Sequence, residues 1–133
     1  MDASSAREQL AELGLLQDGA PDMLELAYAF GAGMVVIDGS IDPDELYYTA
    51  RFGAELFEGF DAEVFEARCR AEPHPPTVTR LAPLAGALLD ERDRTRLFDL
   101  ILAVSQADGK VVPVEARLLR DVARDLGIEM YGG

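Results

Sequence analysis

The sequence has very few of the side chains that build metal centres and disulfides. Among its 133 residues there is one cysteine, Cys69, and one histidine, His74. A single cysteine cannot form an internal disulfide, and one cysteine with one histidine cannot supply the cluster that a zinc site requires. Because disulfides mark oxidising compartments and none can form within this chain, we expect a cytoplasmic protein.

Basic residues are also scarce, and long uncharged runs are absent. Lys and Arg number 12 against 25 Asp and Glu, a formal net charge of −13. A surface of this sign repels phosphate backbones, so we expect no nucleic-acid binding. The longest uncharged run, 26–37, falls short of the roughly 20 residues that span a membrane, and the N-terminus lacks a signal-peptide pattern. We therefore expect no membrane insertion.

Apolar residues recur at helical spacing through most of the chain, whereas strict alternation over the length of a strand does not occur. We predict an all-α fold, a single domain over 1–133 with its core at about 21–128. The first helix is expected to follow the capping box that begins at Ser5, and the second to begin at Pro21. The seven expected helices cover roughly residues 6–13, 21–37, 43–58, 61–70, 81–89, 91–107 and 114–126.

The second expected helix is apolar on every face, which predicts a central position in the bundle. Gly31 and Gly33 lie inside it, where each costs roughly 1 kcal/mol relative to alanine. Close packing of neighbouring helices would offset that cost. This pair of glycines therefore predicts packing and not phosphate binding.

An internal repeat relates the two halves of the chain. DGSIDPDE at 38–45 aligns without a gap on DGKVVPVE at 108–115, and each copy joins a long apolar helix to an amphipathic one. The predicted halves are 21–71 and 77–128, joined by a stiff, proline-rich connection. The chain is thus expected to contain two helix-DG-helix units.

This arrangement resembles the TerB-like family, which includes the tellurite-resistance protein TerB and the N-terminal domain of the co-chaperone DjlA. The resemblance covers roughly 23–128 and is clearest in SQADGKVVPVEARLLRDVARDLGI, 105–128. In the first copy, Ile37 stands where the family more often has alanine. The resemblance implies an all-α fold of about seven helices in a bacterial stress-response setting, with tellurite and metal resistance among the phenotypes.

Both copies of the motif have the residues of a helix-turn-helix corner. In the first, Gly39 can end a helix, Asp42 can cap the next one, Pro43 suits its first position and Glu45 completes a capping box. The second copy keeps these functions at Gly109 and Pro113, but it has Val112 at the capping position. Glu115 is nevertheless retained, which suggests a function beyond capping.

Asp38 and Asp108 each follow the C-terminal end of a helix, where the macrodipole disfavours negative charge. Local bonds to backbone N–H groups would compensate for this. Alternatively, a divalent cation is held by Asp38, Asp42 and Glu45, joined by Asp108 and Glu115 if the two corners meet. Oxygen ligands suit Ca²⁺ or Mg²⁺, although neither loop has the ligand spacing of an EF-hand.

Two functions follow from these patterns. The first is a non-enzymatic protein-interaction module in a stress-response system, because no catalytic or phosphate-binding pattern is present. The second is a divalent-cation sensor or buffer that uses the corner carboxylates. Tyr47 and Tyr48 are adjacent, so at least one is expected to be exposed, and with the apolar second helix they would permit a homodimer.

Overall fold

The computed structural model describes residues 1–37, 41–72, 74–106 and 113–128, with the side chains of α7 described from Ala116 onward. The described residues form seven α-helices and one two-stranded sheet, which confirms the predicted all-α class. In chain order the elements are α1 Ala3–Glu12, β1 Leu16–Gln17, β2 Ala20–Pro21, α2 Met23–Val35, α3 Pro43–Leu56, α4 Ala62–Cys69, α5 Val78–Leu88, α6 Glu91–Gln106 and α7 Pro113–Leu126.

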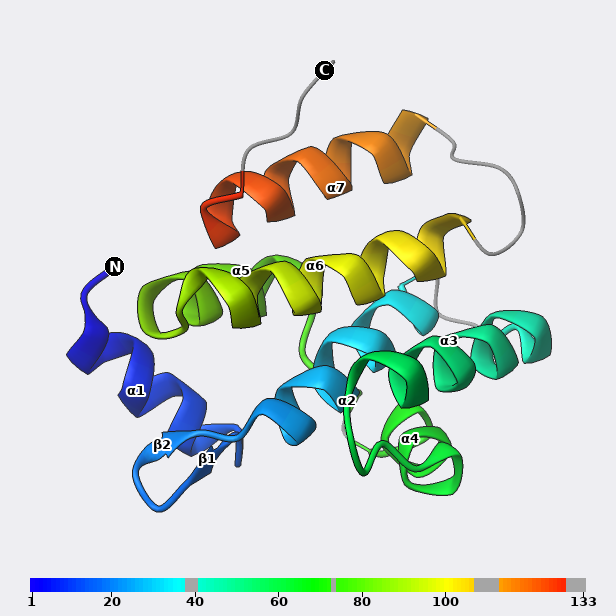
Figure 1. Ribbon diagram of the computed structural model, residues 1–133, viewed down its shortest axis with the longest axis horizontal. Coiled ribbons are helices and arrows are strands. Elements are labelled where there is room, and N and C mark those ends of the chain that lie inside the picture. Colours follow the sequence, from blue (N-terminus) through cyan, green and yellow to red (C-terminus); the bar gives the residue numbers. More distant parts are fainter. Residues whose placement is uncertain (38–40, 73, 107–112, 129–133) are drawn as a thin grey trace.

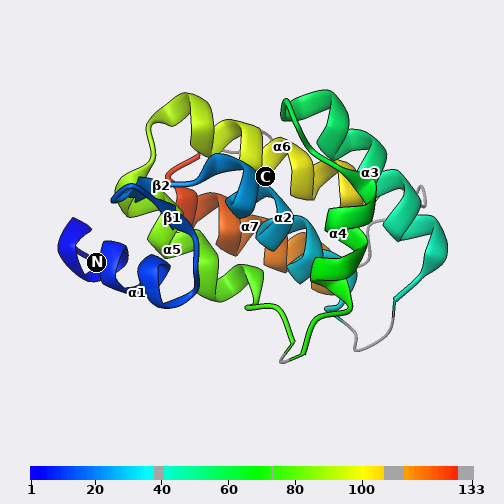
Figure 2. The same ribbon diagram turned by 90° about the horizontal axis from the view of Figure 1, so that it is seen from below.

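Helix α2 is the centre of the bundle. Each of its residues from Leu26 to Val35 is buried, as predicted for a helix that is apolar on every face. Helices α3, α4, α5 and α6 pack against it, while α7 packs on α5 and α6 and α1 packs on α5 (Figures 1 and 2). The hydrophobic core therefore surrounds one helix.

The two glycines inside α2 allow its neighbours to approach closely. A Cβ at Gly31 would lie 2.9 Å from Phe65 Cε1 of α4, closer than real Cβ atoms come to other atoms. A Cβ at Gly33 would lie 2.9 Å from Val78 Cγ2 of α5 and 3.0 Å from the backbone oxygen of Pro76. The packing role predicted for this glycine pair is confirmed.

A short hairpin precedes α2, where we expected no strand. Leu16–Gln17 pairs antiparallel with Ala20–Pro21, and the turn between them places Asp18 at φ 53° and Gly19 at φ 79°. Two consecutive positive φ values define the turn that Asp-Gly favours in two-residue hairpins. The DG dipeptide was the signal for this element, because strands of two residues are too short to show an alternating pattern.

The starts of α1, α2 and α5 differ from the prediction, and an aspartate explains the first two. Asp2 Oδ1 accepts a hydrogen bond from the Ser5 amide at 2.8 Å, so α1 begins ahead of the capping box expected at Ser5. Asp22 Oδ1 accepts from the Glu25 amide at 3.1 Å and caps α2, so Pro21 belongs to β2 and not to the helix. Aspartate is among the strongest N-cap residues.

Two arginines near the start of α6 bind the C-terminal ends of other helices. Arg94 Nη1 donates to the carbonyl oxygen of Leu126 at the end of α7, at 3.0 Å. Arg96 Nη2 donates to the carbonyl oxygen of Leu56 at the end of α3, and its guanidinium lies 4.6 Å from the centroid of the Phe57 ring. Terminal carbonyls lack partners within their own helix, and a cation also favours the negative end of the helix dipole.

Substituting Gly86 with alanine should destabilise the fold by about 1–3 kcal/mol through overpacking. A Cβ at Gly86 in α5 would overlap the backbone oxygen of Asp125 in α7, and backbone cannot move aside as a side-chain end can. Urea unfolding of Gly86→Ala and wild type measures the change. Since alanine normally stabilises a helix interior relative to glycine, a more stable variant would show that α5 and α7 do not pack as described.

Candidate functional site

The N-cap and the first residue of α3 are those that the sequence predicts. Asp42 Oδ1 accepts hydrogen bonds from the amides of Asp44, at 2.8 Å, and Glu45, at 3.4 Å, and Pro43 is the first residue of the helix. The Asp42 side chain is exposed and that of Glu45 is half-buried. Asp42 therefore acts as an N-cap, which satisfies backbone donors that lack a partner within the helix.

Apolar side chains brace the same corner from both sides of the cap. Ile41 precedes Asp42 and Leu46 lies in the first turn of α3, and both are half-buried and packed against the hydrophobic core. These are the positions of a hydrophobic staple, which fixes the angle at which a chain enters a helix. Capping and packing together account for the geometry of this corner.

The remaining predicted ligands and loop residues of the two motifs lie outside the described residues or are described only in their backbone. Asp38, Gly39, Asp108 and Gly109 lie in the undescribed ranges, and for Pro113 and Glu115 only the helical backbone of α7 is described. The helix ends on either side of both motifs nevertheless lie toward the right-hand end of the molecule in Figure 1, opposite α1. Within the described part of the chain, no three His, Cys, Asp or Glu side chains are grouped as metal ligands would be.

Aromatic and aliphatic side chains are exposed near the first corner. Tyr47 is 61% exposed and Tyr48 38%, and their ring centroids lie 5.4 Å apart in an edge-to-face arrangement. Ile37, two residues beyond the end of α2, is also exposed. The prediction that at least one of the two tyrosines reaches solvent is confirmed, because both do.

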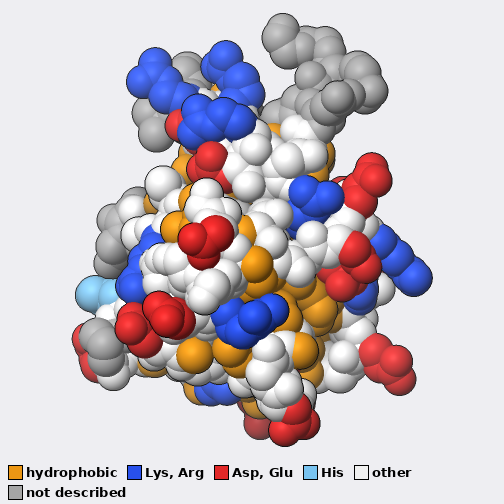
Figure 3. Space-filling model, turned by 90° about the vertical axis from the view of Figure 1, so that its left-hand side faces the viewer, with side chains coloured by type: hydrophobic (Ala, Val, Ile, Leu, Met, Phe, Trp, Pro, Cys, Tyr) orange, Lys and Arg blue, Asp and Glu red, His pale blue; other side chains and the backbone are white. Residues whose placement is uncertain are grey.

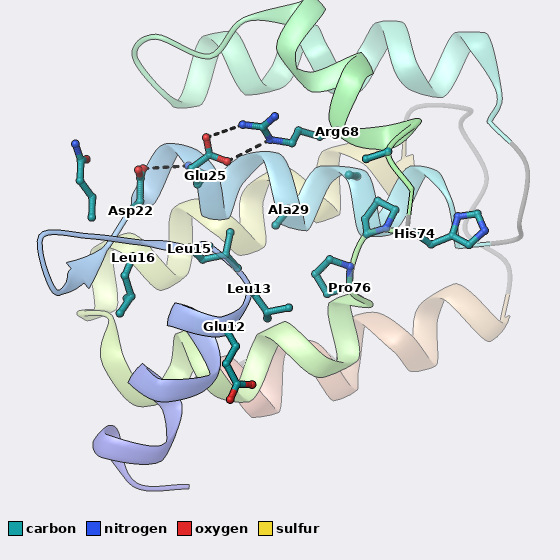
Figure 4. Close-up of a pocket in the computed structure, with 15 residues that line it drawn as sticks. Glu12, Leu13, Leu15, Leu16, Asp22, Glu25, Ala29, Arg68, His74 and Pro76 are labelled. Carbon is teal, nitrogen blue, oxygen red and sulfur yellow. Dashed lines mark hydrogen bonds and ion pairs between the residues drawn. The ribbon is translucent and has the colours of Figure 1, made fainter.

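A groove follows α2 on the side that faces α1, and sequence reasoning did not find it. Its volume is about 670 Å³ and its floor includes Ala29 and Ala32 of α2. The segment Leu13–Gln17 forms one wall, and residues 74–76 with the end of α4 form the other (Figure 4). Figure 3 shows hydrophobic side chains exposed among charged ones at the α1 end of the molecule. The groove arises only when four separate segments meet.

An ion pair bridges the rim of this groove. Arg68 of α4 donates from Nη2 to Glu25 Oε1 at 2.9 Å and from Nε to Glu25 Oε2 at 3.3 Å. The hydrogen bond with Glu25 raises the pKa of Arg68, and its guanidinium lies 5.9 Å from the centroid of the Tyr28 ring. Paired bidentate bonds of this kind have defined geometry, so the ion pair holds α4 against the start of α2.

The single cysteine and the single histidine lie in different environments. The Cys69 side chain is 2% exposed, and burial raises the pKa of its thiol to about 12. It is therefore a neutral, inaccessible thiol at neutral pH. His74 is exposed at the edge of the groove.

Taken together, these features define an all-α bundle that carries a capped helix-helix corner and a surface groove. The sequence matches the family model described as "Tellurite resistance protein TerB" over residues 24–130. The chain belongs to this family, as its repeated corner motif indicated. No curated protein and no solved structure gives a significant match.

The cap at Asp42 predicts a specific pattern of stability changes. Asp42→Ala should lower the free energy of unfolding by about 1 kcal/mol, since it removes the acceptor of two backbone donors, whereas Asp42→Asn should change it little. Chemical denaturation measures both, with Asp44→Ala as a control on the next exposed carboxylate. If Asn destabilised as much as Ala, the charge of Asp42 and not its capping would be the important property.

Proposed function

We propose that this protein is a non-enzymatic interaction module that binds protein partners in a stress-response system of the tellurite-resistance type. The observation that carries the proposal is the half-open groove along α2, whose walls are mainly apolar. Grooves of this kind accept segments of other proteins. The exposed pair Tyr47 and Tyr48 offers a second contact surface, and tyrosine is frequent among residues that dominate interface energetics.

Family membership and charge support the same proposal. The family that the chain matches over residues 24–130 is named for tellurite resistance and not for a reaction. The formal net charge of −13 disfavours nucleic-acid partners, and no helix among the described residues is long and apolar enough to cross a membrane. We propose that the protein acts in the cytoplasm and binds other proteins. One form of this proposal is a homodimer.

Crosslinking in the native host, followed by purification of the tagged chain, should recover at least one partner protein at a reproducible stoichiometry. The control is an unrelated acidic helical protein of similar size, expressed with the same tag. Sedimentation of the purified chain alone distinguishes a homodimer from a complex with another protein. Recovery of the same proteins with both baits, together with a monomeric chain, would contradict an interaction role.

A divalent-cation sensor or buffer is the second candidate. Its support is the exposed carboxylate of Asp42 at a corner whose motif occurs twice in the chain, with Glu45 beside it on α3. The proposed ligands remain Asp38, Asp42, Glu45, Asp108 and Glu115, and the proposed ions Ca²⁺ or Mg²⁺. Carboxylate oxygens are the ligands that these hard cations prefer.

Titration calorimetry with Ca²⁺ and Mg²⁺ tests this candidate. The wild type should bind at least one of the two ions with a dissociation constant below about 1 mM, within the range of known calcium modules. The double variant Asp38→Asn/Asp108→Asn should lose that binding, and Glu58→Gln/Glu63→Gln, which removes two exposed carboxylates elsewhere, should retain it. Equal binding by the two double variants would rule out the corners as the site.

A further inference from the structure

The floor of the groove is one stripe of α2. Asp22, Glu25, Ala29 and Ala32 are spaced at three- and four-residue intervals, which places them along one side of the helix. Two of the four are alanines, whose short side chains leave the hollow above them. From Asp22 to Ala32 the helix rises about 15 Å, the length of roughly ten helical residues.

The two walls are apolar and differ in kind. Leu13, Leu15 and Leu16 border the groove on the side of α1 and β1, while Pro75 and Pro76 border it on the other. Leu13 and Leu16 are half-buried, so part of each side chain still faces solvent. An occupant that presents apolar side chains would remove this surface from water, at about 25 cal/mol per Å².

The charge of the groove is uneven. Glu25 is neutralised by its paired bonds with Arg68, which leaves Glu12 and Asp22 as the carboxylates of the lining without an opposite charge beside them in the described residues. In Figure 4, Glu12 lies at the end of α1 and Asp22 at the start of α2, while Arg68 lies on α4 and His74 in the segment that follows α4. In a chain of net charge −13, a lining with two such carboxylates attracts cations.

The shape favours a helical occupant over an extended one. The nearest strand, β1, has two residues, which is too short an edge to accept an added strand. Ala29 and Ala32 are only 8% and 1% exposed, so an occupant contacts mainly the two walls and reaches the floor with side chains inserted between them. A helix of about three turns matches the length of the floor.

We propose that the groove binds a short, basic, amphipathic helical segment of a partner protein. Its apolar side chains insert between the leucine wall and the proline wall above Ala29, and its Lys or Arg side chains lie toward Glu12 and Asp22. This inference rests on the proposed interaction function and specifies the class of partner. A second copy of this chain is disfavoured as the occupant because both copies would carry the same large negative charge.

The test selects peptides of about twelve random residues, displayed in a library, on the immobilised full-length chain. The enriched peptides should carry net positive charge and apolar residues at helical spacing, and synthetic copies should bind in fluorescence anisotropy. Ala29→Phe, which fills the floor, should weaken binding at least about tenfold. The double variant Glu12→Gln/Asp22→Asn should weaken it several-fold, since asparagine keeps the cap of α2 while the charge is lost.

Matched controls separate the groove from general effects. Ala54→Phe adds the same ring on the exposed side of α3, and Glu58→Gln/Asp61→Asn removes the charges of one exposed glutamate and one N-cap aspartate outside the groove. Both should change binding less than about twofold. Thermal melting checks that Ala29→Phe folds. If Ala29→Phe does not fold, Glu12→Gln/Asp22→Asn still tests the proposal.

Several results would overturn this inference. The first is a selection that yields no binders, or binders with net negative charge. The second is that Glu12→Gln/Asp22→Asn and Glu58→Gln/Asp61→Asn weaken binding equally. The third is full affinity in an Ala29→Phe variant that folds. A dimer that Ala29→Phe dissociates would make a second copy the occupant instead. If a native partner binds all groove variants as well as the wild type, the proposed function stands and this site is rejected. If peptides bind through the groove but no native partner is found, this site stands and the proposed function is rejected.

Discussion

The burial of α2 is the constraint on which the rest of the structure depends. An apolar helix with ten consecutive buried residues needs cover on every side, and the other helices are arranged to supply it. Small residues determine how close that cover comes. At Gly31 and Gly33 the neighbouring elements reach contact distance, whereas Ala29 and Ala32, 8% and 1% exposed, are covered from the sides by segments that leave the groove between them. Helix packing and the groove thus have one origin.

Much of this arrangement was predictable because it follows from local pattern. Helical periodicity identified each helix, and the motif at 38–45 correctly placed the cap at Asp42 and the start of α3 at Pro43. The errors were also local and have physical causes. Asp2 and Ser5 are comparable caps, and Asp2 begins α1 because its carboxylate binds the Ser5 amide, whereas Asp22 caps α2 and leaves Pro21 in β2.

Features that join distant segments were not predictable in the same way. The carbonyl partners of Arg94 and Arg96 lie 32 and 40 residues away in sequence, so no local pattern at the charged start of α6 indicates them. Local spacing can indicate an ion pair within the helix, such as that between Asp93 and Arg96 at 3.6 Å. The groove was missed for the same reason, since no single segment contains the pattern for it.

The two arginines of α6 also make distant helices depend on each other. Residues two apart on an α-helix point about 200° away from each other, so Arg94 reaches α7 while Arg96 reaches α3. If the first turn of α6 frayed, the hydrogen bonds to the carbonyl oxygens of Leu126 in α7 and Leu56 in α3 would be lost together. Local opening at the start of α6 is therefore coupled to both ends, and these three regions are expected to open as one cooperative unit.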